Sequence, residues 1–167
     1  MNTITPTPAI ATVPTELPAP SSATLAEMHA REHATCFACG STGVHGLGLS
    51  FRLSPDGTSV LADWHPPAWS VSYDGTVHGG LVATVLDSAM VHALFARGCS
   101  ARTADLHLRY RQPVKPAAPC RIEARLVSRR GGAFQLEATL HQAGLLCARA
   151  VATFILNSAV EGWFWRG

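Results

Sequence analysis

Asp87 is the only formal charge in a long apolar stretch, Leu81 to Ala96, which reads LVATVLDSAMVHALFA. Such a stretch predicts a helix that is buried on most of its sides, wrapped by other elements rather than lying on a surface. Burying a carboxylate is costly unless it is paired or protonated, and burial raises its pKa toward the range where a general base works. Asp87 is therefore a candidate base or nucleophile, and the alternative is a packing role in which it bonds a loop backbone.

Two glycines, Gly79 and Gly80, stand directly before this stretch and follow His78. The first amides of a helix lack partners inside the helix and lie at its positive end. Glycines let a ligand approach those amides closely, so the turn could hold a carbonyl oxygen as it becomes an oxyanion. A tight turn with no other function is the alternative.

The spacing of Gly79 and Asp87 indicates more than one subunit. They are eight positions apart, which is about 12 Å along a helix axis. A base must come within about 3 Å of the water that it activates, so these two groups of one chain do not serve one small carbonyl. Two antiparallel helices from two subunits would form two composite sites, and we predict a homodimer or a dimer of dimers.

The helices and strands that position these residues are predicted from the alternation of apolar and polar residues and from the glycines and prolines that end each element. Residues 102–112 place Ala104, Leu106, Leu108 and Tyr110 on one apolar face, with period two. A single apolar helix against an antiparallel sheet, whose last four strands form a meander, is an α+β architecture. The predicted helices are 23–33 and 79–97, and the predicted strands are 49–53, 59–64, 102–112, 120–127, 133–141 and 145–156.

The composition sets limits on the class of protein. A chain of 167 residues fits one domain, and we place it at 23–157, after a tail at 1–22 that we expect to be disordered and before an aromatic tail at 158–167. Hydrophobic residues make up 47% and charged residues 14%, which is consistent with apolar surface covered by another subunit. A net charge of +2 argues against nucleic acid as a partner.

The expected location is the cytoplasm. No apolar run reaches the roughly 18 residues of a membrane span, and the N-terminus has no basic region followed by an apolar core. Five cysteines, an odd number, favour reduced thiols over a disulfide framework.

Two segments resemble a known family. His78-Gly79-Gly80 followed by Ala83 to Asp87 is similar to the signature of hotdog-fold acyl-CoA thioesterases of the phenylacetate-pathway type. Thr103 to Tyr110, ending in Gln112-Pro113-Val114, resembles the strand after the helix in that family, and 36–49 resembles the N-terminal segment of one branch. The resemblance covers about 34–157 and implies an antiparallel sheet around one long central helix, with sites between subunits.

The resemblance also implies roles for single residues. Asp87 would attack the thioester or activate water, and the amide of Gly79 would polarise the thioester carbonyl. His78 would shape the turn, and Thr103 would help to hold the water. Ser72 stands where many members carry Asn or a similar amide, and its shorter hydroxyl could still hold water.

Binding of coenzyme A is assigned to a second group of residues. Arg109, Arg129 and Arg130 lie near predicted strand ends and turns, and Arg forks suit phosphate oxygens, with a solvated basic edge as the alternative. Gly80 and Tyr73 complete the predicted substrate-binding set. No cofactor is expected beyond the coenzyme A of the substrate.

The pair Cys36 and Cys39, with His33 and His45 nearby, is half of the four-ligand set that zinc normally needs. Since the family resemblance accounts for the pair without a metal, we expect none, and no thioredoxin-like pattern supports redox chemistry. His92 is expected to be a satisfied core histidine.

The predicted reaction is hydrolysis of an acyl-CoA or acyl-carrier-protein thioester to the free acid and thiol. Two alternatives stay open at this point. One is a hotdog dimer that binds an acyl thioester or small ligand without turnover, which the change at Ser72 favours. The other is a hydratase or dehydratase on the same fold.

Overall fold

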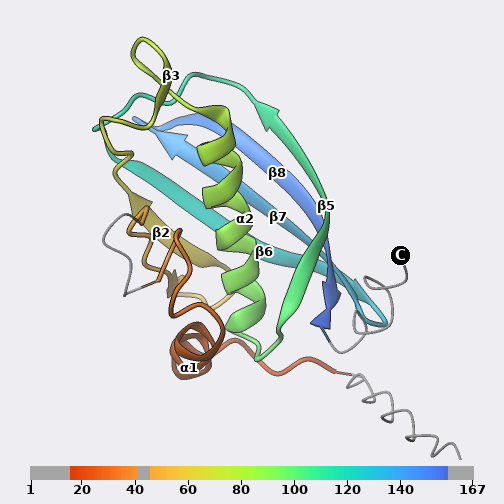
Figure 1. Cartoon of the computed structure of the whole chain (residues 1–167). Helices are drawn as coiled ribbons and strands as arrows, with labels where there is room; N and C mark the ends of the chain where they lie inside the picture. The colour runs from red at the N-terminus through yellow and green to blue at the C-terminus, as the bar shows by residue number, and fades with distance from the viewer. Residues whose placement is uncertain (1–15, 41–45, 158–167) are drawn as a thin grey trace, which may run out of the picture.

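The structure, a computed structural model, describes residues 16–40 and 46–157 and has an α+β architecture (Figure 1). The predicted tail at 1–22 falls outside this part of the chain up to residue 15, and the aromatic tail at 158–167 and His45 fall outside it entirely. The elements, in chain order, are α1 (Ser22–Glu32), β1 (Arg52–Leu53), β2 (Val60–Trp64), β3 (Val71–Tyr73), β4 (Thr76–Val77), α2 (Gly79–Phe95), β5 (Ala101–Tyr110), β6 (Cys120–Arg130), β7 (Ala133–Gln142) and β8 (Leu145–Leu156).

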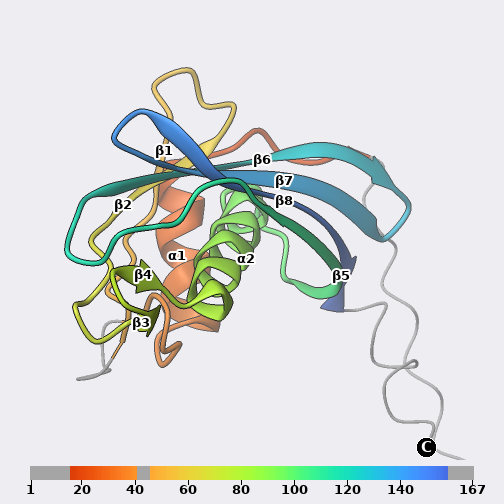
Figure 2. The same cartoon turned by 90° about the horizontal axis from the view of Figure 1, so that it is seen from above.

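One antiparallel sheet, in the order β1-β2-β6-β7-β8-β5, curves around α2 (Figure 1). Both helices lie on the same side of this sheet, and α1 packs beside α2 (Figure 2). The predicted antiparallel sheet around one long helix is therefore confirmed. No helix in the described ranges is long and apolar enough to cross a membrane.

The predicted four-strand meander is wrong in one respect. β6, β7 and β8 follow one another as neighbours, but β5 pairs with β8 at the edge of the sheet and not with β6. The connection at 111–119 contains three prolines, which exclude a tight hairpin at this point. It crosses the end of the sheet instead, where the carbonyl of Val114 accepts a bond of 2.8 Å from the amide of Val77 in β4.

The first predicted strand, 49–53, is shorter than expected. The amides of Leu47 and Leu49 donate to the carbonyls of Phe37 and Ala38, so this segment pairs with the loop after α1 before β1 begins. The short hairpin of β3 and β4 was not predicted.

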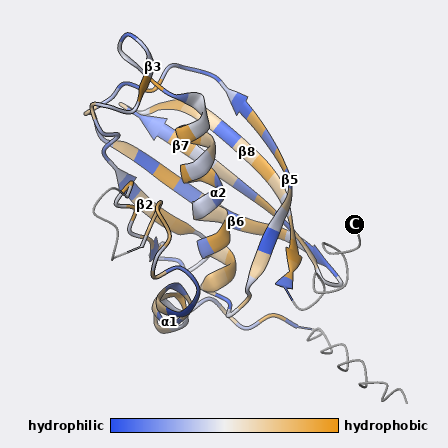
Figure 3. Cartoon of the chain, in the orientation of Figure 1, coloured by the Kyte–Doolittle hydropathy of each residue, from blue (hydrophilic) through white to orange (hydrophobic). Residues whose placement is uncertain are grey.

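Helix α2 differs along its length. From Ser88 to Ala96 every residue is buried, as predicted for a wrapped helix. Hydrophobic residues also concentrate in the part of α2 nearest α1 (Figure 3). In the first turns, however, Gly80 is exposed and Ala83, Thr84 and Asp87 are half-buried. These positions recur at helical spacing, so the first half of α2 presents an open face that the sheet does not cover.

Candidate active site

The start of α2 is organised by His78. Its backbone, at φ −58° and ψ 127°, is extended just before the helix, and its Nδ1 accepts a bond of 2.9 Å from the amide of Gly80. The carbonyl of His78 accepts from the amide of Leu81 at 2.9 Å. His78 thus caps the first turn of α2, and its part in the site stays a prediction. The amide of Gly80, by contrast, is already used inside the turn.

The amide of Gly79 has no acceptor within the described part of the chain. Its carbonyl accepts a bond of 2.8 Å from the hydroxyl of Tyr110, and a Cβ placed on Gly79 would lie 3.0 Å from that hydroxyl oxygen. A free N–H at the positive end of a helix suits an oxyanion. Sequence reasoning placed Tyr110 only on the apolar face of its strand, because its contact with Gly79 depends on how β5 packs against the start of α2.

Asp87 and Thr103 meet directly. The hydroxyl of Thr103 donates to Asp87 Oδ1 at 2.7 Å. Burial raises the pKa of Asp87, while the bond from Thr103 and the nearby imidazole of His33 act in the opposite direction. A carboxyl group with a raised pKa, half-buried on the open face of α2, can take a proton from water or attack a carbonyl.

A bulge in β5 aims Thr103 at Asp87. Thr103 pairs with Phe154 and Asp105 pairs with Thr153, so Ala104 is the extra residue. Residues opposite each other in a sheet point to the same side, and Phe154 is fully buried on the side of α2. Strict alternation would have turned Thr103 away from the helix, and the bulge reverses it.

The start of α2 and the pair of Asp87 with Thr103 remain separate within one subunit. Ser72, Tyr73 and Gly79 line a groove of about 360 Å³ together with Tyr110. Asp87 does not line this groove and lies two turns further along α2, which is about 12 Å. Within one chain the predicted catalytic residues thus form two separate groups, one at the groove beside Gly79 and the other at Asp87 and Thr103.

The predicted phosphate-binding arginines are divided as well. Arg129 donates through Nε to the carbonyl of Gly131 at 2.9 Å, at the turn between β6 and β7, and Arg130 is exposed beside it. Arg109 is exposed near the far end of β5. The strand register aligns Arg129 with the start of β5 at Thr103, so Arg109 lies about 20 Å further along the sheet.

Side chains that could hold a metal gather away from Asp87. The two clusters of three or more such ligands among the described residues both contain Cys39, from the loop after α1. All five cysteines are free thiols.

Comparison with known proteins gives a consistent result. Residues 74–148 match the model of the thioesterase superfamily. A phenylacetic acid degradation-related protein from Ralstonia eutropha is 26% identical, with a TM-score of 0.64, over 79% of this chain and 98% of that chain. A thioesterase superfamily protein is 24% identical, with a TM-score of 0.65, and the match covers 71% of this chain and only 61% of that one.

A hypothetical thioesterase protein from Streptococcus pneumoniae, solved with coenzyme A, is 17% identical, with a TM-score of 0.61, over 65% of this chain and 88% of that one. A search of curated proteins gives no match.

Proposed function

We propose that this chain, which belongs to the thioesterase superfamily and has its hotdog fold, hydrolyses acyl thioesters of coenzyme A to the free acid and thiol. The observation that carries the proposal is the contact of Asp87 with Thr103 on the open face of α2. An acyl-carrier-protein thioester is the second substrate form that this chemistry accepts.

In the proposed mechanism Asp87 acts as general base or nucleophile. Burial raises its pKa and so increases its affinity for a proton, and Thr103 fixes the orientation of the carboxyl group. As a base, Asp87 takes a proton from water while the water oxygen attacks the thioester carbonyl. When the carbon–sulfur bond breaks, the proton held by Asp87 passes to the departing sulfur, so that coenzyme A leaves as the thiol, the acyl group leaves as the carboxylic acid and Asp87 is again a carboxylate.

The oxyanion that forms on the carbonyl would be bound by the amide of Gly79, which has no acceptor among the described residues. Since Gly79 and Asp87 of one chain are about 12 Å apart, the amide must come from the other subunit of a dimer. The open face formed by Gly80, Ala83, Thr84 and Asp87 supports this arrangement, because a partner helix could cover it and place its own first turn beside Asp87.

Two observations support coenzyme A as the thiol of the substrate: the exposed arginines of the sheet, and similar structures that were solved with coenzyme A or acetyl CoA. The S. pneumoniae relative was solved with coenzyme A, and a protein from Streptococcus mutans was solved with acetyl CoA. Of the three predicted arginines, Arg129 is already held by Gly131, so Arg130 and Arg109 have the freer guanidinium groups. Variants of the S. pneumoniae protein replace an aspartate and a threonine sixteen positions apart by alanine, and Asp87 and Thr103 have the same spacing.

The test is thiol release from aromatic and aliphatic acyl-CoA esters, with wild type, Asp87→Asn and the control Asp63→Asn side by side. Asp63 is an exposed carboxylate in β2 that pairs with Arg52. We expect release by wild type and by the control, and a loss of about 10²–10⁴-fold in Asp87→Asn. Undiminished release by Asp87→Asn would overturn the role of Asp87.

Two further outcomes would favour the alternatives. Binding of acyl-CoA and acyl-carrier-protein thioesters without any release would support the ligand-binding protein. Addition of water to a 2-enoyl thioester, with no thiol released, would support the hydratase.

A further inference from the structure

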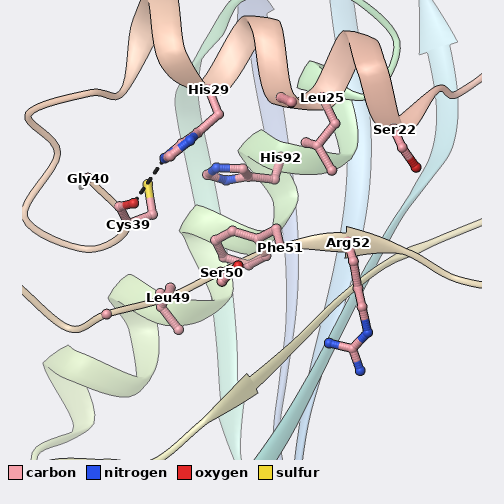
Figure 4. A pocket seen from close by; sticks show the side chains of 12 residues that line it. Ser22, Leu25, His29, Cys39, Gly40, Leu49, Ser50, Phe51, Arg52 and His92 are labelled. Carbon is pink, nitrogen blue, oxygen red and sulfur yellow. Dashed lines mark hydrogen bonds between the residues drawn. The ribbon is translucent and has the colours of Figure 1, made fainter.

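Five imidazole and thiol side chains meet where α1 and the loop after it pack on the buried end of α2. His29 comes from α1, His33 from its C-terminal cap, Cys36 and Cys39 from the loop, and His92 from α2. In Figure 4, His29, Cys39 and His92 point toward one another from these three segments. None of these side chains belongs to the proposed thioesterase machinery.

The geometry around Cys39 suits a tetrahedral metal ion. The ligand atoms of His33, Cys36 and Cys39 all lie within 4.8 Å of one another, and Cys39 Sγ is 3.4 Å from His33 Nδ1. Bonds of about 2.3 Å from zinc to sulfur and about 2.1 Å to nitrogen, at a tetrahedral angle, place these two atoms about 3.6 Å apart. Three ligands are therefore close to coordinating positions without a change of fold.

His92 offers a fourth ligand atom. The ligand atoms of His92, His29 and Cys39 also lie within 4.8 Å of one another, so Cys39 is common to both clusters, and the His92 side chain has to shift toward His33 and Cys36 to complete the set. The side chain is only 1% exposed, and its Nδ1 is 2.7 Å from the carbonyl of Ser88. If Nδ1 carries the proton and donates it to that carbonyl, Nε2 presents a lone pair, which is the usual arrangement of a metal-bound histidine.

His92 Nε2 is also a buried atom without a hydrogen-bond partner among the described residues. Leaving such an atom unsatisfied is costly, so its position indicates a ligand. His29 is the weaker candidate, since its Nε2 is already 2.9 Å from the carbonyl of Cys39. The prediction that His92 is a core histidine with all its hydrogen bonds made therefore holds for Nδ1 and is wrong for Nε2.

We propose that Cys36, Cys39, His33 and His92 bind one zinc ion, which joins α1 and its loop to α2. Two thiolates and two imidazoles form a closed structural set with no open position for substrate. This proposal departs from the expectation of no metal, since only half of the set was recognised in the sequence and His92 lies more than fifty positions after the cysteine pair. The zinc proposal does not rest on the thioester chemistry, and either proposal can fail without the other.

Zinc binding must release the thiol protons to solvent. Without a metal, burial raises the pKa of Cys39 to about 12, so this thiol is protonated at neutral pH. Each of Cys36 and Cys39 gives up one proton as its sulfur bonds to the ion. Affinity is therefore expected to increase with pH.

The experiment uses the full-length, tag-free protein, reduced and stripped of metal with a chelator. Zinc or cobalt(II) is added, excess ion is removed, and bound metal is measured by mass spectrometry. We expect about one zinc per chain, and with cobalt the visible and thiolate charge-transfer bands of tetrahedral sulfur and nitrogen coordination. Cys36→Ser with Cys39→Ser should lose both signals, and His92→Gln should weaken them.

The matched control is Cys99→Ser with Cys147→Ser, which removes two other thiols, both buried, but leaves the cluster intact. It should bind metal as the wild type does. Reduced wild type that retains no zinc and shows no thiolate–cobalt band would overturn the proposal. Full zinc retention by the Cys36→Ser, Cys39→Ser variant would overturn it as well. The wild-type measurement decides even if a variant fails to fold.

Discussion

Replacing Gly79 by proline removes the backbone donor proposed for the thioester carbonyl, and the local geometry accepts the ring. Gly79 is the first residue of α2, the helix position at which proline is favoured because its N–H has no partner inside the helix. The residue before a proline must be extended, and His78, at φ −58° and ψ 127°, already is. Proline here deletes one amide hydrogen at little cost to the helix.

Gly79→Ala is the matched control. Both variants add a Cβ that would lie 3.0 Å from the hydroxyl oxygen of Tyr110, an exposed side chain that must move by a few tenths of an ångström. Only the proline variant also lacks the amide hydrogen. The ratio of their rates therefore isolates the amide from the side chain.

The expected ratio is large. Removal of one oxyanion donor typically lowers kcat by about 10²–10³, which corresponds to about 2.7–4 kcal/mol of transition-state stabilisation. Thiol release from an acyl-CoA should thus be about 10²–10³-fold slower in Gly79→Pro than in Gly79→Ala, with equal melting temperatures as evidence of intact folding. Equal rates in two folded variants would refute the assignment of the Gly79 amide.

Three further outcomes are expected. Thr103→Val removes a hydrogen bond to a charged group worth about 1.5–3 kcal/mol, so kcat/KM should fall about ten- to a hundredfold. Because the hydrogen bond from Thr103 lowers the pKa of Asp87, the acid limb of the pH–activity profile should move to higher pH in Thr103→Val. The control is Thr153→Val, on the outer face of β8. An acid limb that stays in place in Thr103→Val would contradict the contact between Thr103 and Asp87. Asp87→Asn should be more stable than wild type at neutral pH. Burial raises the pKa of Asp87 above its usual value of 3.8, so the carboxyl group keeps its proton to higher pH in the folded chain than in the unfolded chain. At neutral pH the ionised carboxylate therefore lowers the free energy of unfolding, and Asn, which carries no charge, does not. The difference in melting temperature between Asp87→Asn and wild type should become smaller as the pH falls toward 3.8. A difference that does not change with pH would show that the charge of Asp87 is not its cause. His78→Ala removes the acceptor of the Gly80 amide and should cost about 0.5–2 kcal/mol in urea unfolding, whereas unchanged stability would exclude the capping role.

Much of the architecture could be predicted because local signals determine it. The apolar run with glycines before it predicted a helix at 79–97, and α2 spans Gly79–Phe95. Gly98, the predicted end of that helix, has a φ of +71°, which a side chain rarely adopts. Alternation and turn residues likewise placed β5 to β8 to within a few residues.

Long-range pairing could not be predicted in the same way. The pairing of β5 with β8 and the bulge at Ala104 depend on which strands are neighbours in the sheet. The hydrophobic period of a strand does not specify its neighbour. Asp87 was identified from the helix pattern and Thr103 through the family resemblance, while strict alternation would have turned Thr103 outward. His92 was missed as a ligand for a related reason, since its neighbours come from α1 and the following loop.

The central claim, that each site combines Gly79 of one subunit with Asp87 of another, is tested by mixing two inactive variants. Gly79→Pro and Asp87→Asn are expressed together at equal levels, and thiol release is compared with each variant alone. Half of the dimers would be mixed and hold one intact site of two, so activity should return to about a quarter of wild type. A mixture as inactive as the separate variants, although subunits exchange, would place Gly79 and Asp87 in one chain and contradict the account.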